Sequence, residues 1–167
     1  VRDRTDALDA VGNTTAAIAK GFAIASAGLS AISLFVSYQA TMHHAIPNFE
    51  LTLTDPLIVA GIFIGAMMPF MFAALTMGAV SRAAHAMVEE VRRQFREIKG
   101  IMTYEAEPEY DKCVAISTSS ALREMMLPGC LAIIVPVAIG CFNPAMLGGF
   151  LAGAVATGML MAIFMSN

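Results

Sequence analysis

The sequence has 167 residues, of which 57% are hydrophobic and 14% charged, and its mean hydropathy is +0.70. Soluble chains average roughly 45–50% apolar and about 25% charged residues, so this composition excludes both an ordinary soluble domain and a disordered chain. The net charge of −3 argues against a nucleic-acid-binding protein, which needs a basic face. The three cysteines show no CxxC or metal-ligand spacing. We therefore predict an all-α, polytopic transmembrane helical bundle.

The basic residues predict where the membrane lies. None of the ten Lys and Arg residues falls between residues 21 and 81 or after residue 123. Each gap is long enough for helices that cross a hydrocarbon core of roughly 30 Å. We expect residues 1–167 to form part of a transmembrane domain, with four spans at about residues 5–40, 56–98 (with a cytoplasmic extension), 111–142 (with a cytoplasmic start) and 145–165.

The same residues predict the orientation. Cytoplasmic loops carry an excess of Lys and Arg, whereas the loops at residues 39–55 and 143–144 have neither. The N-terminal end, the region 81–123 and the C-terminal end are therefore expected in the cytoplasm.

Within the region 81–123 and just after it, polar residues predict surface contacts. Glu89 and Arg93 have the i,i+4 spacing of a helical ion pair. The three glutamates of the loop at residues 100–111 are expected to be solvated. Arg123 and Glu124 could form an interhelical ion pair, but the sequence does not assign their role.

Prolines and glycines mark two further features of the spans. Pro128 and Pro136 predict kinks in the third span. Gly149 and Gly153 have the GxxxG spacing that lets helices approach closely. Small residues scattered through a crowded bundle would explain this spacing equally well.

The first span begins with a polar face. On a helix of 100° per residue, Asp6, Asp9, Asn13 and Lys20 share a stripe about 60° wide and about 21 Å long. Lys20 directly precedes an uninterrupted apolar run, where a charge is costly unless it faces a watery or ion-filled interior. The alternative is an N-terminal acidic cluster with a snorkelling lysine. Carboxylate and amide oxygens suit hard cations such as Mg²⁺ and K⁺.

Three motifs resemble one known family. The motifs are RTDALDAVGNTTAAIAKGFAI at residues 4–24, MVEEVRRQF at residues 87–95 and YDKCVAIS at residues 110–117. Together they resemble the membrane-integral, ion-pumping pyrophosphatases over essentially the whole chain, and the first motif is highly specific.

The resemblance implies a fold and an activity. The family has sixteen transmembrane helices, works as a homodimer in the lipid bilayer, and hydrolyses Mg-pyrophosphate on the cytoplasmic side to drive H⁺ or Na⁺ across the membrane. This chain would supply about the twelfth to fifteenth helices. Its expected partners are pyrophosphate and the rest of the pump polypeptide, and its cofactors are Mg²⁺ and activating K⁺.

The resemblance also implies roles for residues of the stripe. Asn13 would help to hold Mg-pyrophosphate or the activating cation, and Asp6 and Asp9 would belong to the acidic wall of the site. Lys20 would lie at the top of the ion path.

Two alanines imply K⁺ dependence. Ala16 stands where K⁺-independent members carry a lysine, so alanine resembles the K⁺-dependent subfamily. Ala19 departs from the pattern, because K⁺-dependent members usually have glycine there and K⁺-independent members threonine. Alanine is nearer glycine in size and has no hydroxyl.

The resemblance assigns no catalytic residue to this chain. The family's other acidic clusters lie on helices outside it, and hydrolysis needs metals and a positioned water. We therefore expect the chain alone to be inactive. The alternative is a non-catalytic helical membrane module of a transporter or structural subunit, or the product of a decayed or split gene. The choice between H⁺ and Na⁺ stays open.

Overall fold

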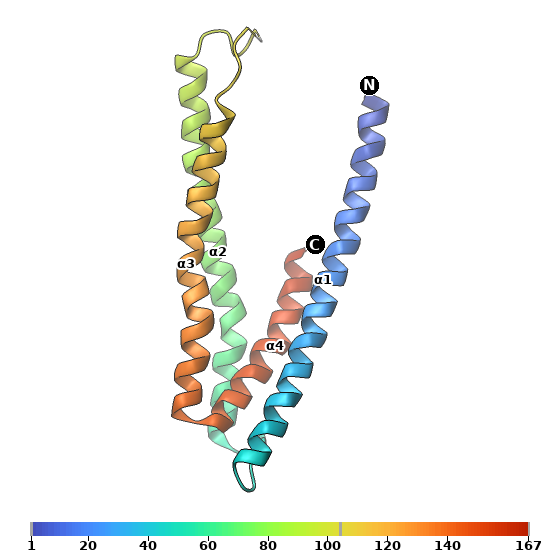
Figure 1. Ribbon diagram of the computed structural model, residues 1–167, viewed down its shortest axis with the longest axis vertical. Coiled ribbons are helices and arrows are strands. Elements are labelled where there is room, and N and C mark those ends of the chain that lie inside the picture. The colour runs from blue at the N-terminus through green and yellow to red at the C-terminus, as the bar shows by residue number, and fades with distance from the viewer. Residues whose placement is uncertain (1, 104, 167) are drawn as a thin grey trace. The chain divides into compact units, whose positions relative to one another are not determined.

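The computed structural model describes residues 2–103 and 105–166 and contains four α-helices in this part of the chain (Figure 1). They are α1 (Arg2–Ala45), α2 (Pro56–Glu97), α3 (Tyr110–Phe142) and α4 (Pro144–Ser166). All four are long and apolar enough to cross a membrane. The predicted all-α class with four spanning helices is therefore confirmed.

Contacts divide the chain into two units. The first unit holds the described residues up to Phe70 together with those from Pro136 onward, and the second unit runs from Met71 to Val135. The boundaries lie beside Pro69 in α2 and Pro136 in α3. Proline removes a helical hydrogen bond, so each division falls where its helix has lost one. Both helices nevertheless continue through their prolines, and the kinks at Pro128 and Pro136 stay a prediction.

The helix bounds differ most from expectation at α1. This helix begins at Arg2 and ends at Ala45, whereas the sequence predicted about residues 5–40. The polar residues after Gln39 are compatible with a helix, and the first strong breaker is Pro47, which disfavours helical geometry in the residue before it. Asn48 then adopts a φ of 57°, which no helix continues. The other bounds differ from those predicted by a residue or less.

The starts of α2 and α4 have the same local cause. Asp55 Oδ1 accepts a hydrogen bond from the Leu57 amide at 2.8 Å, and Asn143 Oδ1 accepts one from the Met146 amide at 3.0 Å. In each helix a proline follows the capping residue and supplies a φ already suited to the first turn.

The helices α1 and α2 are longer than a bilayer's hydrocarbon core is thick. With 44 and 42 residues at 1.5 Å per residue, they measure roughly 66 and 63 Å, about twice the hydrocarbon thickness. The apolar run of α1 begins after Lys20, and that of α2 ends near residue 80. The positions of the polar start of α1 and of residues 81–97 of α2 outside the hydrocarbon core stay a prediction.

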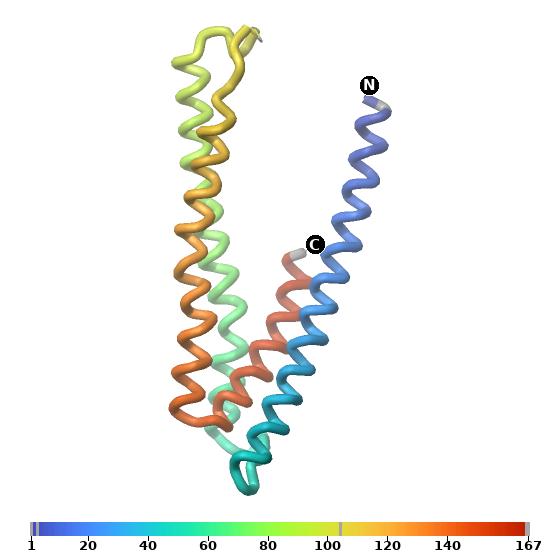
Figure 2. Tube along the Cα trace, in the orientation of Figure 1, coloured from blue at the N-terminus to red at the C-terminus, as the bar shows by residue number. Residues whose placement is uncertain are grey.

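Within the first unit, α1 and α4 lie side by side in antiparallel directions (Figure 2). The Tyr38 hydroxyl donates a hydrogen bond to the Pro144 carbonyl at 2.7 Å. Farther along, a Cβ added at Gly28 would meet the side chain of Met159. The N-terminal end of α1 extends beyond the last described turn of α4, and its polar side chains are exposed.

The start of α2 packs against α4 through glycines. A Cβ at Gly149 or Gly153 would overlap the carbonyl oxygen of Ile58 or Ile62, respectively. Two glycines of α2 with the same spacing, Gly61 and Gly65, meet the backbone of α4 at Met146 and Phe150 in the same way. Of the two readings of Gly149 and Gly153, close helix contact is thus confirmed. The matching pair in α2 was not recognised in the sequence.

Little of the apolar surface is covered inside the chain. The buried apolar residues among those described are Phe49, Ile58, Met68 and Phe150, all in the first unit. No residue of α3 is buried. Such open apolar faces are expected of helices that contact lipid or further helices.

Candidate functional site

The polar stripe lies on the N-terminal part of α1. Asp6, Asp9, Asn13 and Lys20 all lie on this helix, as predicted, and their side chains are exposed. Thr14 and Thr15 do not interrupt this part of α1. Their hydroxyls donate hydrogen bonds to backbone carbonyls four residues earlier, at 3.0 and 2.9 Å, within the same helix.

One side-chain contact organises the stripe. Asn13 Nδ2 donates to Asp9 Oδ2 at 3.1 Å, across one helical turn. This bond fixes which end of the carboxamide faces Asp9 and leaves Asn13 Oδ1 as a second oxygen beside the carboxylate. Among the described residues, no hydrogen bond joins Asp6 to either of them. Asp6 shares only their face of the helix.

An open cavity of about 530 Å³ brings part of the stripe together with α4. Asn13, Ala16 and Lys20 line it from α1, and Met159 and Ile163 line it from α4. The structure thus gathers three of the six predicted site residues at one cavity. Asp9 is joined to them through Asn13, whereas Asp6 and Ala19 are not part of the lining.

The donor set fits a hard cation in part. Asp9 and Asn13 offer adjacent oxygens of the type that Mg²⁺ and K⁺ prefer. The described residues contain no group of three or more His, Cys, Asp or Glu side chains able to hold a metal ion. The oxygens of Asp9 and Asn13 are thus fewer than the about six to eight that a hard cation takes.

A second polar cluster, beyond the apolar run of α2, is centred on Arg93 in the second unit. Its guanidinium contacts Glu90 at 2.6 Å, Glu97 at 2.5 Å and Glu109 at 2.6 Å. The predicted Glu89–Arg93 pair is therefore wrong, and Glu89 instead pairs with Arg92 at 3.4 Å. Arg93 turns toward carboxylates that converge on it from α2 and from the loop that leads into α3.

The cluster changes the acidity of two carboxyl groups. Hydrogen bonds from Arg93 and Gln94 lower the pKa of Glu90 to about 2. Those from Lys112 and Arg93 lower the pKa of Glu109. The expectation of a freely solvated loop is thus wrong for Glu109, because both cations hold its carboxylate.

Gln94 is buried, with 4% of its surface exposed, and closes the hairpin of α2 and α3. Its Oε1 accepts from the Glu109 amide at 3.0 Å, and its Nε2 donates to the Glu109 carbonyl at 3.2 Å. Sequence reasoning missed this clamp. A signal was present, because Gln94 lies at helical spacing from the apolar residues Met87 and Val91.

Nearer the membrane, Arg82 of α2 binds Glu124 of α3 through two hydrogen bonds, of 2.8 and 2.5 Å. The pair is bidentate, which is the geometry that a planar guanidinium and a carboxylate favour. Glu124 therefore does belong to an interhelical ion pair, and its partner is Arg82.

Comparisons with known proteins agree with the three motifs. The family model described as inorganic H⁺ pyrophosphatase matches residues 1–167. A Clostridium tetani relative named as a K⁺-stimulated pyrophosphate-energized sodium pump is 57% identical over 100% of this chain and 24% of its own length. A Bacteroides thetaiotaomicron relative with the same name is 48% identical over 100% of this chain and 27% of its own.

A third relative carries a different name. The Methanosarcina mazei protein, a K⁺-insensitive pyrophosphate-energized proton pump, is 46% identical over 100% of this chain and 25% of its own length. The chain thus spans about a quarter of the curated relatives that it matches. The family model matches every residue of the chain, so the chain belongs to the inorganic H⁺ pyrophosphatase family.

Proposed function

We propose that this chain is a segment of a primary ion pump that couples Mg-dependent hydrolysis of inorganic pyrophosphate to transport of H⁺ or Na⁺. The observation that carries the proposal is the cavity lined by Asn13, Ala16 and Lys20, where the polar stripe meets the apolar run of α1. The names of the relatives support the same activity.

Each polar residue of the stripe has a role set by its place. Asn13 would bind Mg-pyrophosphate or the activating cation through Oδ1, since its Nδ2 is engaged by Asp9. Asp9 and Asp6 would form an acidic wall that attracts Mg²⁺. The Lys20 ammonium, one residue before the apolar run, would stand at the entrance of the ion path. Bound Mg²⁺ would neutralise phosphate charge and activate water.

The activating cation would be K⁺, because Ala16 and Ala19 lack the lysine and threonine that K⁺-independent members carry at these positions. Ala16 lines the same cavity as Asn13, and its methyl group places no charge there. A lysine at this position could direct an ammonium group into the cavity in place of K⁺. The two relatives named as K⁺-stimulated are 57% and 48% identical to this chain, and relatives named as K⁺-insensitive are 46–47% identical, so the 57% match is the one that favours K⁺ stimulation.

The segment would work only within the whole pump, as a homodimer in the lipid bilayer. We expect residues 1–167 alone not to hydrolyse pyrophosphate, because hydrolysis needs metals and a positioned water. The N-terminal end, the region 81–123 and the C-terminal end would lie in the cytoplasm, because all ten Lys and Arg residues fall on that side.

Pyrophosphate hydrolysis in membranes that express the complete protein tests the proposal. We expect phosphate release that rises with added K⁺ at saturating Mg²⁺. Hydrolysis indifferent to K⁺ would keep the pump and contradict the role of Ala16. No hydrolysis from the intact protein would favour a non-catalytic membrane module.

A further inference from the structure

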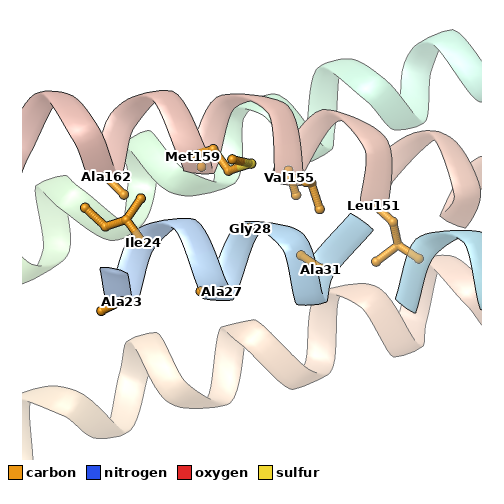
Figure 3. Close-up of a pocket in the computed structure, with 11 residues that line it drawn as sticks. Ala23, Ile24, Ala27, Gly28, Ala31, Leu151, Val155, Met159 and Ala162 are labelled. Atoms are coloured by element: carbon orange, nitrogen blue, oxygen red, sulfur yellow. The ribbon is translucent and has the colours of Figure 1, made fainter. Parts of the chain in front are cut away.

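Two open cavities of the first unit have similar volumes but different chemistry. The groove of about 490 Å³ between α1 and α4 is lined by apolar side chains such as Ile24, Val155 and Met159, and none of its lining residues is charged (Figure 3). The cavity at the C-terminal end of α1 has a volume of about 520 Å³. Its polar lining residues are Gln39 and His43 of α1 and Glu50 and Thr52 of the loop that follows.

A hydrogen bond fixes the tautomer of His43. Its Nδ1 lies 3.3 Å from the carbonyl oxygen of Phe49. A carbonyl can only accept, so Nδ1 carries the proton and the lone pair of the neutral imidazole is on Nε2. Histidines that bind metals commonly have this arrangement, in which the other ring N–H donates to a backbone carbonyl and orients the ring. Phe49 is buried, with 8% of its surface exposed, so this carbonyl is held in place.

The carboxylate of Glu50 is the second candidate ligand. Glu50 directly follows Phe49 and lines the same cavity as His43. No Lys or Arg occurs between residues 21 and 81, so no basic side chain from this stretch neutralises its charge. His43 also lies in the last turn of α1, where the helix dipole favours a positive charge. The cavity therefore combines an imidazole nitrogen, a carboxylate and a negative local potential.

These donors select a class of ion. An imidazole nitrogen with a carboxylate oxygen suits divalent transition-metal ions such as Zn²⁺, whereas Mg²⁺ prefers oxygen ligands alone. The described residues contain no group of three or more His, Cys, Asp or Glu side chains at one metal site. Water or the Gln39 carboxamide oxygen would therefore supply the other ligands, and binding would be weaker than at a structural zinc site with four protein ligands.

We propose that His43 Nε2 and the Glu50 carboxylate bind Zn²⁺, or a similar divalent transition-metal ion, and thereby tie the end of α1 to the loop at residues 46–55. The site is separate from the polar stripe, because His43 follows Asn13 by 30 residues on one helix, a distance of roughly 45 Å. The inference goes beyond the proposed function and does not depend on pyrophosphate hydrolysis.

Zn²⁺ binding to the complete protein tests the site. The purified protein is titrated with Zn²⁺ in a large excess of Mg²⁺, which occupies sites made of oxygen ligands alone, and without pyrophosphate, which would itself bind Zn²⁺. We expect His43→Gln and Glu50→Gln each to weaken binding at one Zn²⁺ site by about tenfold or more, since loss of even a supporting group costs about 10–100-fold.

His44→Gln is the matched control, because His44 is the neighbouring histidine, is also exposed, and is not among the residues that line the cavity. Its affinity for Zn²⁺ should equal that of the unaltered protein. Unchanged binding in His43→Gln and Glu50→Gln, or an equal loss in His44→Gln, would overturn the proposal. If His43→Gln does not fold, Glu50→Gln decides alone, because it changes an exposed side chain to one of nearly the same size.

Hydrogen exchange locates the ion. Zn²⁺ should slow the exchange of backbone amides at residues 46–55 several-fold, and this protection should be absent in His43→Gln and present in His44→Gln. Protection elsewhere in the protein, without any change in this loop, would contradict the proposal. Pyrophosphate hydrolysis, measured separately on the same preparations, keeps a failure of the proposed function distinct from a failure of the Zn²⁺ site.

Discussion

The two units hold their helices together by different means. In the first unit, α2 and α4 touch through glycines that bring the backbones together, and α1 meets α4 at Gly28 and Tyr38. In the second unit, α2 and α3 are joined by side chains, through Arg82, Arg93 and Gln94. The difference follows from solvent, because close packing works in lipid, whereas charged and amide groups need the watery end of the hairpin.

The glycine contact is the feature whose disruption should have the largest effect. Gly153→Ala forces a methyl group onto the Ile62 carbonyl, and overpacking of this kind costs typically about 1–3 kcal/mol. We expect a clear fall in the thermal stability of the purified pump. Gly129→Ala is the control, because a Cβ there meets nothing within 4 Å in this chain. Equal stability of the two variants would contradict the contact.

Asn13→Ala tests the polar stripe of the same unit. Asn13 is the proposed cation ligand and donates a hydrogen bond to Asp9, so its loss should lower kcat/KM for Mg-pyrophosphate by about 10–100-fold, as for other groups that support metal sites. Titrations of Mg²⁺ and pyrophosphate measure the change. An unaltered kcat/KM would remove Asn13 from the proposed site.

Gln94→Ala tests the clamp of the second unit. It leaves the amide and carbonyl of Glu109 without their partner, and an unsatisfied buried group costs about 1–3 kcal/mol. We expect faster hydrogen exchange in the loop at residues 98–109, with little change elsewhere. Arg92→Ala is the control, since Arg92 makes only a long, exposed pair with Glu89. Equal exchange in both variants would be evidence against a clamp.

Ala16→Lys tests the cation site without breaking it. The added ammonium should replace K⁺, so hydrolysis should lose its K⁺ stimulation and keep most of its activity, with Ala19→Thr added where the single change is insufficient. A K⁺ titration of each variant gives the result. Full K⁺ stimulation in the double variant would contradict the assignment of both alanines.

The smallest expected effect is the acid response of the second unit. The pKa of Glu90 is lowered to about 2, so its contribution to stability is present above its ordinary pKa near 4.5 and is lost as the pH falls toward 2. Glu109 acts in the same direction. Hydrogen exchange of the loop should therefore rise as the pH falls through this window, after correction for the intrinsic rate. Glu90→Gln should flatten that rise, and an unchanged profile would contradict the role of Glu90.

The sequence by itself determined the helices, the spans and the polar stripe. Each depends on local spacing: the gaps without Lys or Arg, the caps Asp55 and Asn143, and the period that aligns Asp9 with Asn13. The end of α1 differs from the prediction because the polar residues after Gln39 stay helical and Pro47 is the first strong helix breaker.

Only the tertiary structure decided which residues meet across helices. Arg93 had Glu89, Glu90 and Glu97 within helical reach, and the carboxylate of Glu109 helped to select its orientation. The partner of Glu124 lies 42 residues away, and Gly149 meets Ile58 across 91 residues. Such pairs depend on how two helices are positioned and rotated against each other, and no local spacing in the chain specifies that.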